Sequence, residues 1–497
     1  MLATQTMYAQ IYIAPGGNDD STGTIDYPYQ TFEKAISVSE PGDTIYIRGG
    51  TYNLSATITI SYARSGTADQ LKTLMAYKDE IPVLDGSLLP SGKKGISLQS
   101  NYWHIKGLHI TNALDNGMEI YFGSNNIVEQ CQFYRNKDTG LQLSQGSANN
   151  QIINCDSYFN ADPPDYGDAD GFAPKLTVGS GNYFYGCRSW GNCDDGWDGY
   201  LRGADDISTT LENCWTWGNG YRENGTDPGS QANGNGFKMG GGDNSNSLEL
   251  MHHMTLINCV AFDNKNKGFD QNNNEGSMTL LNCSGYNNIT ANFRIQRELK
   301  AGQVLTVKNS VSYDGLVQLG DFAVQETNSW LGQFQVNADD FISLDSDQAS
   351  SARNADGSLP EIGFLHLAQG SDLIDAGTDL GYPFNGDAPD LGAFESDFTT
   401  AIEYLNDNIL SHFQLRQNYP NPFNPATRIE FVIPYSDHVN VSVYDLSGHL
   451  VATLLDKWIE AGDHTLDFRA RNLASAVYFY TIKTAGYTKT KKMLLVK

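Results

Sequence analysis

The sequence is short of positive charge. It has 32 lysine and arginine residues against 58 aspartates and glutamates, a formal net charge of −26. A chain this acidic repels nucleic acid and anionic membrane surfaces, so we expect neither as a partner. No run of about 18 or more apolar residues occurs, so no membrane span is expected. Only 18% of residues are charged and glycine reaches 50, which is typical of an all-β protein with many turns.

The sequence also lacks a disulfide or zinc pattern, because its seven cysteines are odd in number and widely spaced. Six of them open a repeated segment, Cys-x-x-aromatic-x-Asn, and Gly107 and Ser310 open related segments. The eight starts are separated by 24, 24, 32, 27, 45, 24 and 27 residues. We interpret these cysteines as packing residues. The six segments begin at Cys131, Cys155, Cys187, Cys214, Cys259 and Cys283.

A second element recurs once in each repeat and consists of a small residue followed by an apolar one. Each repeat therefore carries two short strands and turn residues, with no helical period between them, as expected for one coil of a β-helix. Equivalent residues then stack on neighbouring coils at about 4.8 Å, and stacked asparagines satisfy the turn backbone. We predict a right-handed parallel β-helix over residues 11–396. The second elements are Gly117-Met, Gly140-Leu, Gly171-Phe, Gly196-Trp, Gly236-Phe, Gly268-Phe and Asn292-Phe.

The ends of this predicted β-helix have their own signals. Residues 31–37 have a helical pattern and are expected to cap the open end, and residues 42–48 are expected to form an early coil strand. The coils are expected to close near residues 390–395. Residues 1–10 lack a basic n-region, and whether they are the remnant of a signal peptide is left open.

The repeat places acidic residues in register. Asp170 and Asp195 both directly precede the glycine of the second element, on adjacent coils, and Asp194 lies one position further back. The residue two positions after that glycine faces outward, which aligns Asp198 with Lys238 on the next coil.

Four carboxylates this close cannot all stay ionised in the open, and calcium accepts several carboxylate oxygens in flexible geometry. The register therefore predicts a calcium site at these four aspartates, beside Lys238. A protein this acidic also repels an acidic polymer, and a bound cation would reverse the charge locally.

A C-terminal domain follows, with residues 397–411 expected as a linker and residues 412–497 as a small β-sandwich of short, regularly spaced strands. The segments 415–425 (LRQNYPNPFNP) and 443–448 (VYDLSG), with the terminal residues 491–497, closely resemble the type A sorting domain of the Bacteroidetes type IX secretion system. The resemblance implies export by that machinery and a secreted or surface-attached protein. A carbohydrate-binding module is the alternative, although Trp458 is the only tryptophan here.

Three segments of the repeat region, 170–175 (DGFAPK), 193–198 (CDDGWD) and 235–238 (NGFK), resemble the site segments of the family nine polysaccharide lyases, which are pectate lyases. The similarity spans roughly residues 10–395. It implies that Asp170, Asp194, Asp195 and Asp198 bind Ca²⁺. It also implies that Lys238 is the base of a β-elimination on an acidic, plant-type polysaccharide such as polygalacturonate. The insertion at residues 221–232 is expected to be a variable loop that affects substrate choice.

Two further cations are candidates for binding substrate carboxylates. Arg294 lies two coils from Lys238 in the same outward column, and Lys175 lies on the other side. The alternatives are a polygalacturonase-like hydrolase using the same carboxylates, a rhamnogalacturonan lyase, and a calcium-binding surface adhesin that leaves Lys238 without a purpose. We expect a monomer; the polymer and the endo or exo action stay open.

Overall fold

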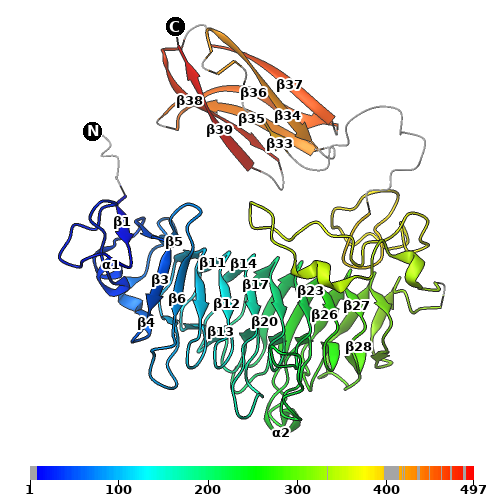
Figure 1. Cartoon of the computed structure of the whole chain (residues 1–497). Helices are drawn as coiled ribbons and strands as arrows, with labels where there is room; N and C mark the ends of the chain where they lie inside the picture. Colours follow the sequence, from blue (N-terminus) through cyan, green and yellow to red (C-terminus); the bar gives the residue numbers. More distant parts are fainter. Residues whose placement is uncertain are drawn as a thin grey trace. The chain divides into compact units, whose positions relative to one another are not determined.

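The computed structural model describes residues 8–332, 334–396 and 414–496, the last range with gaps at 417, 419, 422, 434–436, 447, 461, 471–472 and 485–487. The chain divides into two compact units, Met1–Thr399 and Thr400–Lys497. The expected linker at 397–411 and most of the expected signal-peptide remnant lie outside the described residues. In the first unit three long parallel sheets run side by side, as Figure 1 shows, and this confirms the right-handed parallel β-helix.

Each complete coil of the β-helix contributes one strand to each sheet, in the order A, B, C, and the end strands β1 and β32 add to sheet A alone. Sheet A contains β1 (Gln10–Ile13), β2 (Thr44–Ile47), β5 (Lys72–Ala76), β8 (Trp103–Lys106), β11 (Ile127–Glu129), β14 (Gln151–Ile153), β17 (Asn182–Tyr185), β20 (Ile207–Glu212), β23 (His252–Ile257), β26 (Met278–Leu281), β29 (Leu305–Lys308) and β32 (Val324–Glu326). Sheet B contains β3 (Gly50–Asn53), β6 (Pro82–Asp85), β9 (His109–Thr111), β12 (Gln132–Tyr134), β15 (Asp156–Tyr158), β18 (Arg188–Trp190), β21 (Trp215–Trp217), β24 (Val260–Phe262), β27 (Ser284–Tyr286) and β30 (Val311–Tyr313). Sheet C contains β4 (Ile58–Ile60), β7 (Ile96–Leu98), β10 (Met118–Tyr121), β13 (Leu141–Ser144), β16 (Phe172–Pro174), β19 (Trp197–Asp198), β22 (Phe237–Lys238), β25 (Lys267–Asp270), β28 (Ala291–Ile295) and β31 (Val317–Leu319).

The coils have three strands, not the two expected from the sequence. The cysteine segments form sheet B and the glycine segments form sheet C. Apart from the predicted strand β2, sheet A was missed in the repeat region, where its strands lie directly before the cysteines. A short strand such as β14, which buries only Ile152 fully, shows too little alternation to be recognised from its pattern, whereas β20 alternates over six residues and could have been recognised.

A buried asparagine ladder joins successive coils. The backbone N–H and the Nδ2 of Asn192 both donate to Oδ1 of Asn219, at 3.1 and 3.0 Å, and Asn160 makes the same pair of bonds to Asn192. The stacked turns are thereby satisfied without water. All seven cysteines are free and buried, which confirms their role in packing. The members of the ladder are Asn136, Asn160, Asn192, Asn219, Asn264, Asn288 and Asn292.

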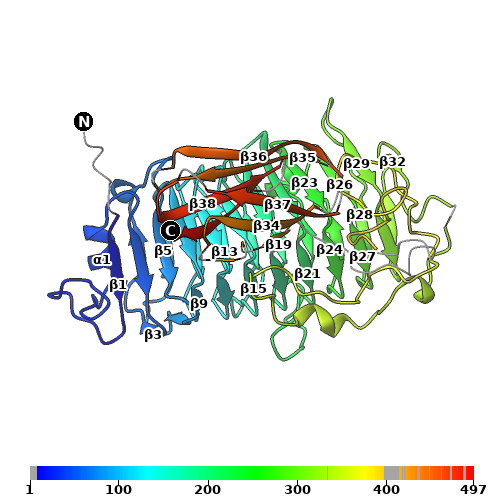
Figure 2. The same cartoon turned by 90° about the horizontal axis from the view of Figure 1, so that it is seen from above.

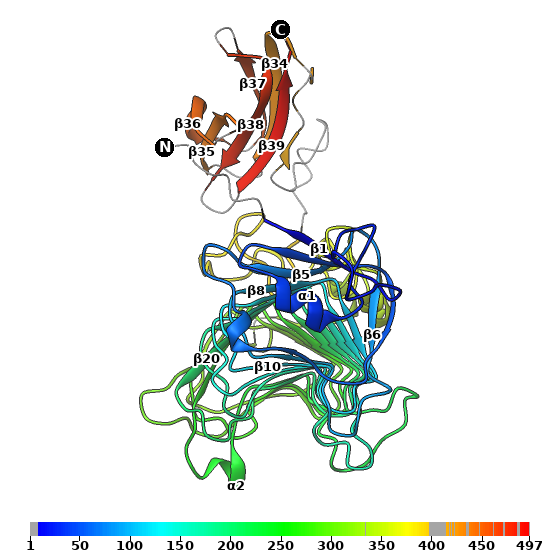
Figure 3. The ribbon, with the colours of Figure 1, turned by 90° about the vertical axis from the view of Figure 1, so that its left-hand side faces the viewer.

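The N-terminal end of the β-helix is closed by helix α1 (Phe32–Val38). Thr31 caps it by accepting a hydrogen bond from the backbone N–H of Lys34 at 3.2 Å, and Phe32, Ala35 and Ile36 are buried in the core. Figure 3 looks along the coils from this end, with α1 and β1 nearest the viewer. The predicted cap and the early strand β2 are therefore present. A short 3-10 turn, η1 (Tyr62–Arg64), follows β4.

The parallel strands end at β32, well before residues 390–395, where the sequence placed the end of the coils. The following segment lies along sheet B (Figure 2) and includes the turns η2 (Ala338–Asp340) and η3 (Ser346–Ser350). Phe364 packs on Phe262 of β24, and the Asp156 carboxylate of β15 is buried between Arg188 and Arg353. This segment thus covers the outer face of sheet B with a second apolar cluster instead of adding coils.

The second unit consists of two antiparallel sheets around a core that includes Phe431, Val441 and Tyr480. This arrangement matches the predicted small β-sandwich. In the part of the chain that the structure describes, no helix has the length and hydropathy to cross a membrane. One sheet contains β33 (Gln414–Leu415), β34 (Ala426–Ile433) and β37 (Gly462–Arg469), and the other β36 (Leu450–Ile459), β35 (Asp437–Tyr444), β38 (Ala476–Lys483) and β39 (Thr488–Leu495).

If the asparagine ladder stabilises the fold, its loss should lower the free energy of unfolding. Replacing Asn192 by Ala removes the acceptor for two buried donors of Asn160, at about 1–3 kcal/mol each. We expect a clearly lower free energy of unfolding and a lower melting midpoint. The exposed Asn354 also makes two hydrogen bonds, but water replaces them, so Asn354→Ala should change the free energy of unfolding by less than about 0.5 kcal/mol. Equal losses in the two variants would contradict a stabilising ladder.

Candidate active site

The pairing of sheet C brings the predicted site residues together. Asp198 of β19 pairs in register with Lys238 of β22, Lys238 pairs with Asp270 of β25, and Asp270 pairs with Arg294 of β28. Asp170 and Asp195 lie just before β16 and β19, on adjacent coils. The outward column drawn from the sequence is therefore present in the fold.

Three of the four aspartates converge at one point. Asp170, Asp194 and Asp195 each offer one oxygen within 4.8 Å of the others, and among the described residues they form the one such group of metal-ligating side chains. All three are buried, as is Asp198 at 4% exposure. Asp198 is linked to the group by Lys175 and Lys238, since each of these lysines contacts Asp198 and one of the other aspartates. The cluster is thus built on two adjacent coils.

Two ammonium groups lie among these carboxylates. Lys238 Nζ is 3.0 Å from Oδ2 of Asp195 and 3.3 Å from Oδ1 of Asp198. Lys175 Nζ is 2.7 Å from Oδ2 of Asp170 and 3.6 Å from Oδ2 of Asp198. Four carboxylates thus face two ammonium groups, so the ionised cluster carries a net charge of −2.

The carboxylates are held by groups that sequence reasoning missed. The backbone N–H and the Nδ2 of Asn235 both donate to Oδ1 of Asp195 at 2.8 Å, and the backbone N–H of Asn233 donates to Oδ1 of Asp194 at 2.5 Å. Asn235 stands in the same column as Asp195 and opens the site segment 235–238, but the sequence assigned it no role. Asn233 follows the irregular insertion at 221–232, and no pattern marked it.

One buried oxygen has no hydrogen bond. Oδ2 of Asp195 lies within ion-pair distance of Lys238 Nζ, but no donor within the described residues points at it. The neighbouring Oδ1 of Asn235 is likewise buried and accepts no hydrogen bond from the described residues. Buried acceptors of this kind are rare in folded proteins, and they suit a hard cation that binds oxygen.

The electrostatics of the cluster follow from its burial. Desolvation raises the pKa of Asp170, Asp194 and Asp195. Burial would also raise the pKa of Asp198, but Lys238 and Lys175 outweigh it and lower that pKa. For Lys238, burial favours the neutral amine, yet Asp195 and Asp198 raise its pKa well above the usual value. Without a cation, Lys238 therefore stays protonated.

The cluster opens into a cleft of about 440 Å³. Lys175, Asp198 and Lys238 lie in its wall, so Lys175 both holds carboxylates and faces the cleft. Arg294 is exposed and does not line this cleft, although it shares the column of Lys238. The cleft is lined by Lys94, Asp115, Asn116, Asp138, Gln142, Gly167, Asp168, Lys175, Leu176, Asp198, Tyr200, Arg202 and Lys238.

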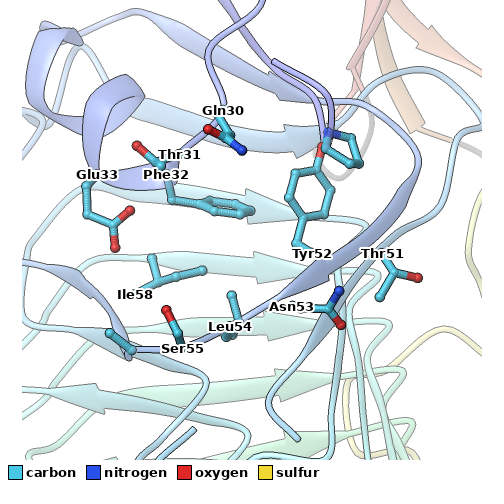
Figure 4. A pocket seen from close by; sticks show the side chains of 12 residues that line it. Gln30, Thr31, Phe32, Glu33, Thr51, Tyr52, Asn53, Leu54, Ser55 and Ile58 are labelled. Carbon is cyan, nitrogen blue, oxygen red and sulfur yellow. The ribbon is translucent and has the colours of Figure 1, made fainter. Parts of the chain in front are cut away.

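A second cavity of about 460 Å³ lies at the N-terminal end of the β-helix, beside α1. Figure 4 shows Phe32 and Tyr52 at its centre, with their rings 5.3 Å apart. Glu33 is the one ionisable acid or base in its lining, apart from the hydroxyl of Tyr52. This cavity therefore lacks the paired acids and bases that the sheet C cleft has.

Comparison with known proteins identifies the chain. Residues 11–309 match the family "Pel9A-like, right handed beta helix region". The chain belongs to this family. A pectate lyase L from Paenibacillus polymyxa is 40% identical over 403 residues, which cover 76% of this chain and 86% of the relative. A pectate lyase L from Dickeya chrysanthemi is 36% identical over 404 residues, which cover 79% and 91%.

Solved structures agree with this assignment. The crystal structure of pectate lyase Pel9A aligns with a TM-score of 0.71 at 35% identity, over 78% of this chain and 97% of that one. A rhamnogalacturonan lyase aligns with a TM-score of 0.64 at 25% identity, over 72% and 96%. The protein is a polysaccharide lyase, so neither the hydrolase nor the adhesin alternative is retained.

Residues 417–497 match the secretion system C-terminal sorting domain, which confirms the resemblance drawn from the LRQNYPNPFNP segment. The carbohydrate-binding alternative for this domain is therefore not retained. The lyase is secreted or attached to the cell surface.

The ion pairs of Lys175 give a prediction for stability. Lys175→Met leaves Asp170 and Asp198 without their shared ammonium group, and removing one partner of a buried pair costs about 3–5 kcal/mol. We expect the free energy of unfolding, measured with chelator present, to fall by that amount. The matched control is Lys308→Met, because Lys308 pairs with Glu326 at a more exposed site, where about 0–1 kcal/mol is expected. A similar loss in both would show that Lys175 is not needed to hold the cluster.

Proposed function

We propose that this lyase cleaves a pectate-type uronate polymer by β-elimination, with calcium as cofactor and Lys238 as base. The observation that carries the proposal is the position of Lys238 Nζ, 3.0 Å from Asp195 and 3.3 Å from Asp198, in the wall of the sheet C cleft. A buried lysine among carboxylates adds little to the stability of the fold, because desolvation offsets the ion pairs, but it suits the role of a base beside a bound cation.

The donor set suits calcium. All four side chains offer carboxylate oxygens, Asp195 Oδ2 has no hydrogen-bond donor among the described residues, and one divalent ion would neutralise the net charge of −2. When bound by Asp170, Asp194, Asp195 and Asp198, calcium would neutralise the C6 carboxylate of the uronate and make the C5 proton more acidic. Asn233 and Asn235 would keep these carboxylates in place.

Lys238 carries the proton transfer in this proposal. Its neutral amine takes the C5 proton, the electrons of the C5–H bond form the C4=C5 double bond, and the bond from C4 to the glycosidic oxygen breaks. The departing oxygen leaves with a proton from solvent. Lys238 must first lose its own proton, and this becomes easier once Asp195 and Asp198 share their charge with a cation instead of with the ammonium group.

Lys175 and Arg294 are proposed to bind substrate carboxylates. Lys175 faces the cleft while it pairs with Asp170 and Asp198, which fits a uronate close to the metal. Arg294 is exposed and lies two strands beyond Lys238, so it suits a sugar further along the chain.

The substrate class rests on the relatives. The similar proteins from Paenibacillus polymyxa and Dickeya chrysanthemi are named pectate lyases, which supports pectate or polygalacturonate. The similarity to a rhamnogalacturonan lyase structure keeps that polymer as the second candidate. For the C-terminal domain, we propose recognition by the type IX secretion machinery, and the protein is proposed to act as a monomer.

The decisive assay is a polysaccharide panel measured with calcium and with excess chelator. We expect polygalacturonate to give the ultraviolet absorbance of an unsaturated uronate in calcium, and almost none in chelator. Lys238→Ala should lower kcat at least about 10³-fold, because the base is lost. Lys106→Ala, which removes a lysine paired with Glu129 on sheet A, is the control and should keep full activity. Full turnover in chelator would exclude calcium, and full turnover of Lys238→Ala would exclude the base.

The pH dependence of kcat/KM tests the lysine separately. Asp195 and Asp198 raise the pKa of Lys238, so the neutral base is scarce at neutral pH and its share grows about tenfold per pH unit below the pKa. We expect kcat/KM to rise towards alkaline pH, and the rise to begin at lower pH as calcium increases. A flat profile between about pH 6 and about pH 10 would contradict a lysine base.

A further inference from the structure

We propose that Arg202, positioned by Tyr200 and Asp243, binds the carboxylate of a uronate next to the one that Lys238 attacks. The inference rests on the proposed function and adds a substrate-binding residue to it. Arg202 and Tyr200 both line the sheet C cleft, together with Lys238.

The backbone extends sheet C beyond its strands at this point. Leu201, three residues after Asp198, forms parallel bridges to Leu176 on one coil and to Gly242 on the next. Leu201 is fully buried, so Tyr200 and Arg202 on either side of it point outward. This short extension forms a rim along the ends of β16, β19 and β22, and it fixes Arg202 relative to Asp198.

The two rims of the cleft differ in charge. Asp115, Asp138 and Asp168 precede β10, β13 and β16 and line one rim together with Lys94, which precedes β7, whereas Arg202 lies on the rim where β19 ends and pairs there with Asp243. The three aspartates repel the carboxylates of a polymer with one carboxylate per sugar, and Arg202 offers exposed donors on the opposite rim. This arrangement favours a pose in which a sugar carboxylate faces Arg202.

Arg202 is arranged to accept a second carboxylate. Its Nε donates to Oδ2 of Asp243 at 3.0 Å, and its Nη2 makes a longer contact of 3.4 Å to Oδ1. A guanidinium group has five N–H donors, so donors remain for another partner. The Arg202 side chain is 61% exposed, and its fork geometry suits a carboxylate.

Tyr200 links this group to the base. Its hydroxyl donates to Oδ1 of Asp243, the same carboxylate that holds Arg202. Lys238 Nζ lies 5.6 Å from the centre of the Tyr200 ring, and Arg202 Cζ lies 5.7 Å from it. The Tyr200 ring thus lies close to both the base and the guanidinium group. A uronate bound at Arg202 is held one sugar away from the reacting C5, which makes Tyr200 a positioning residue.

The test is the steady-state kinetics of Arg202→Gln, with calcium saturating. On polygalacturonate we expect KM to rise about tenfold or more, the loss expected for one charged hydrogen-bonding partner, while kcat changes less than about twofold. The ratio of kcat/KM for polygalacturonate over partly methyl-esterified pectin should fall about tenfold, because an ester gives Arg202 no charge to bind. Arg202→Lys should recover part of the affinity for polygalacturonate.

Arg48→Gln is the matched control. Arg48 pairs with Glu80 through Nε at 2.9 Å and lies over the ring of Tyr77 at 5.2 Å, so it has the same kinds of partner as Arg202. It follows the sheet A strand β2 and does not line the cleft. Its variant should keep the wild-type KM and substrate ratio.

Failure of this inference is distinct from failure of the proposed function. If the wild-type protein forms no unsaturated product from any uronate polymer, the proposed function is wrong. If the wild-type protein is active and Arg202→Gln shows an unchanged KM, the assignment of Arg202 is wrong. The assignment is also overturned if both polymers lose kcat equally while their ratio is unchanged, since that result indicates a merely structural role.

Discussion

Parallel pairing at a constant register is the constraint on which the rest of this molecule depends. Successive coils are joined by strand pairs and by the asparagine ladder, in which Asn192 donates twice to Asn219. One position of every coil therefore falls on a straight column at a spacing of about 4.8 Å. Asp198 and Lys238 are 40 residues apart in the chain, yet they are adjacent because their coils pair in register. A single-residue slip would turn one of them inward.

The same rigidity holds an arrangement that is costly by itself. Burial and neighbouring carboxylates raise the pKa of Asp170, Asp194 and Asp195, and Lys175 and Lys238 offset only half of the charge of the four aspartates. A looser fold would relax by turning these carboxylates towards water. Here Asn233 and Asn235 fix Asp194 and Asp195, and the paired coils fix Asp170. Under the proposed function, the cluster is preorganised for a cation, and the protonation of Lys238 would depend on whether that cation is bound.

Much of the site could be predicted from the sequence because it follows the repeat. Several of its residues occupy fixed positions relative to the glycine of sheet C, or to Asn292 in its place, so counting residues was enough to place Asp170, Asp195, Asp198, Lys238 and Arg294. The residues that counting could not place lie outside the repeat. Asn233 follows an irregular insertion, Arg202 lies on a rim beyond β19, and the segment after β32 packs on sheet B through individual side chains such as Arg353 and Phe364. Their positions depend on tertiary packing, which no period encodes.

The overall charge of the protein is a poor guide to what this cleft binds. A net charge of −26 argues against an acidic polymer, and the rim with Asp115, Asp138 and Asp168 would reject one. Screening limits such repulsion to about 8–10 Å at physiological ionic strength, so the groups that line the cleft decide binding. Along the opposite wall lie Lys238, Lys175 and Arg202, and each of them is paired with an aspartate. A divalent ion at the aspartate cluster would cancel the net charge of −2 that remains there. Under the proposed function, the acidic rim and the exposed guanidinium group of Arg202 would orient the polyanion, and the neutralised cluster would no longer repel it.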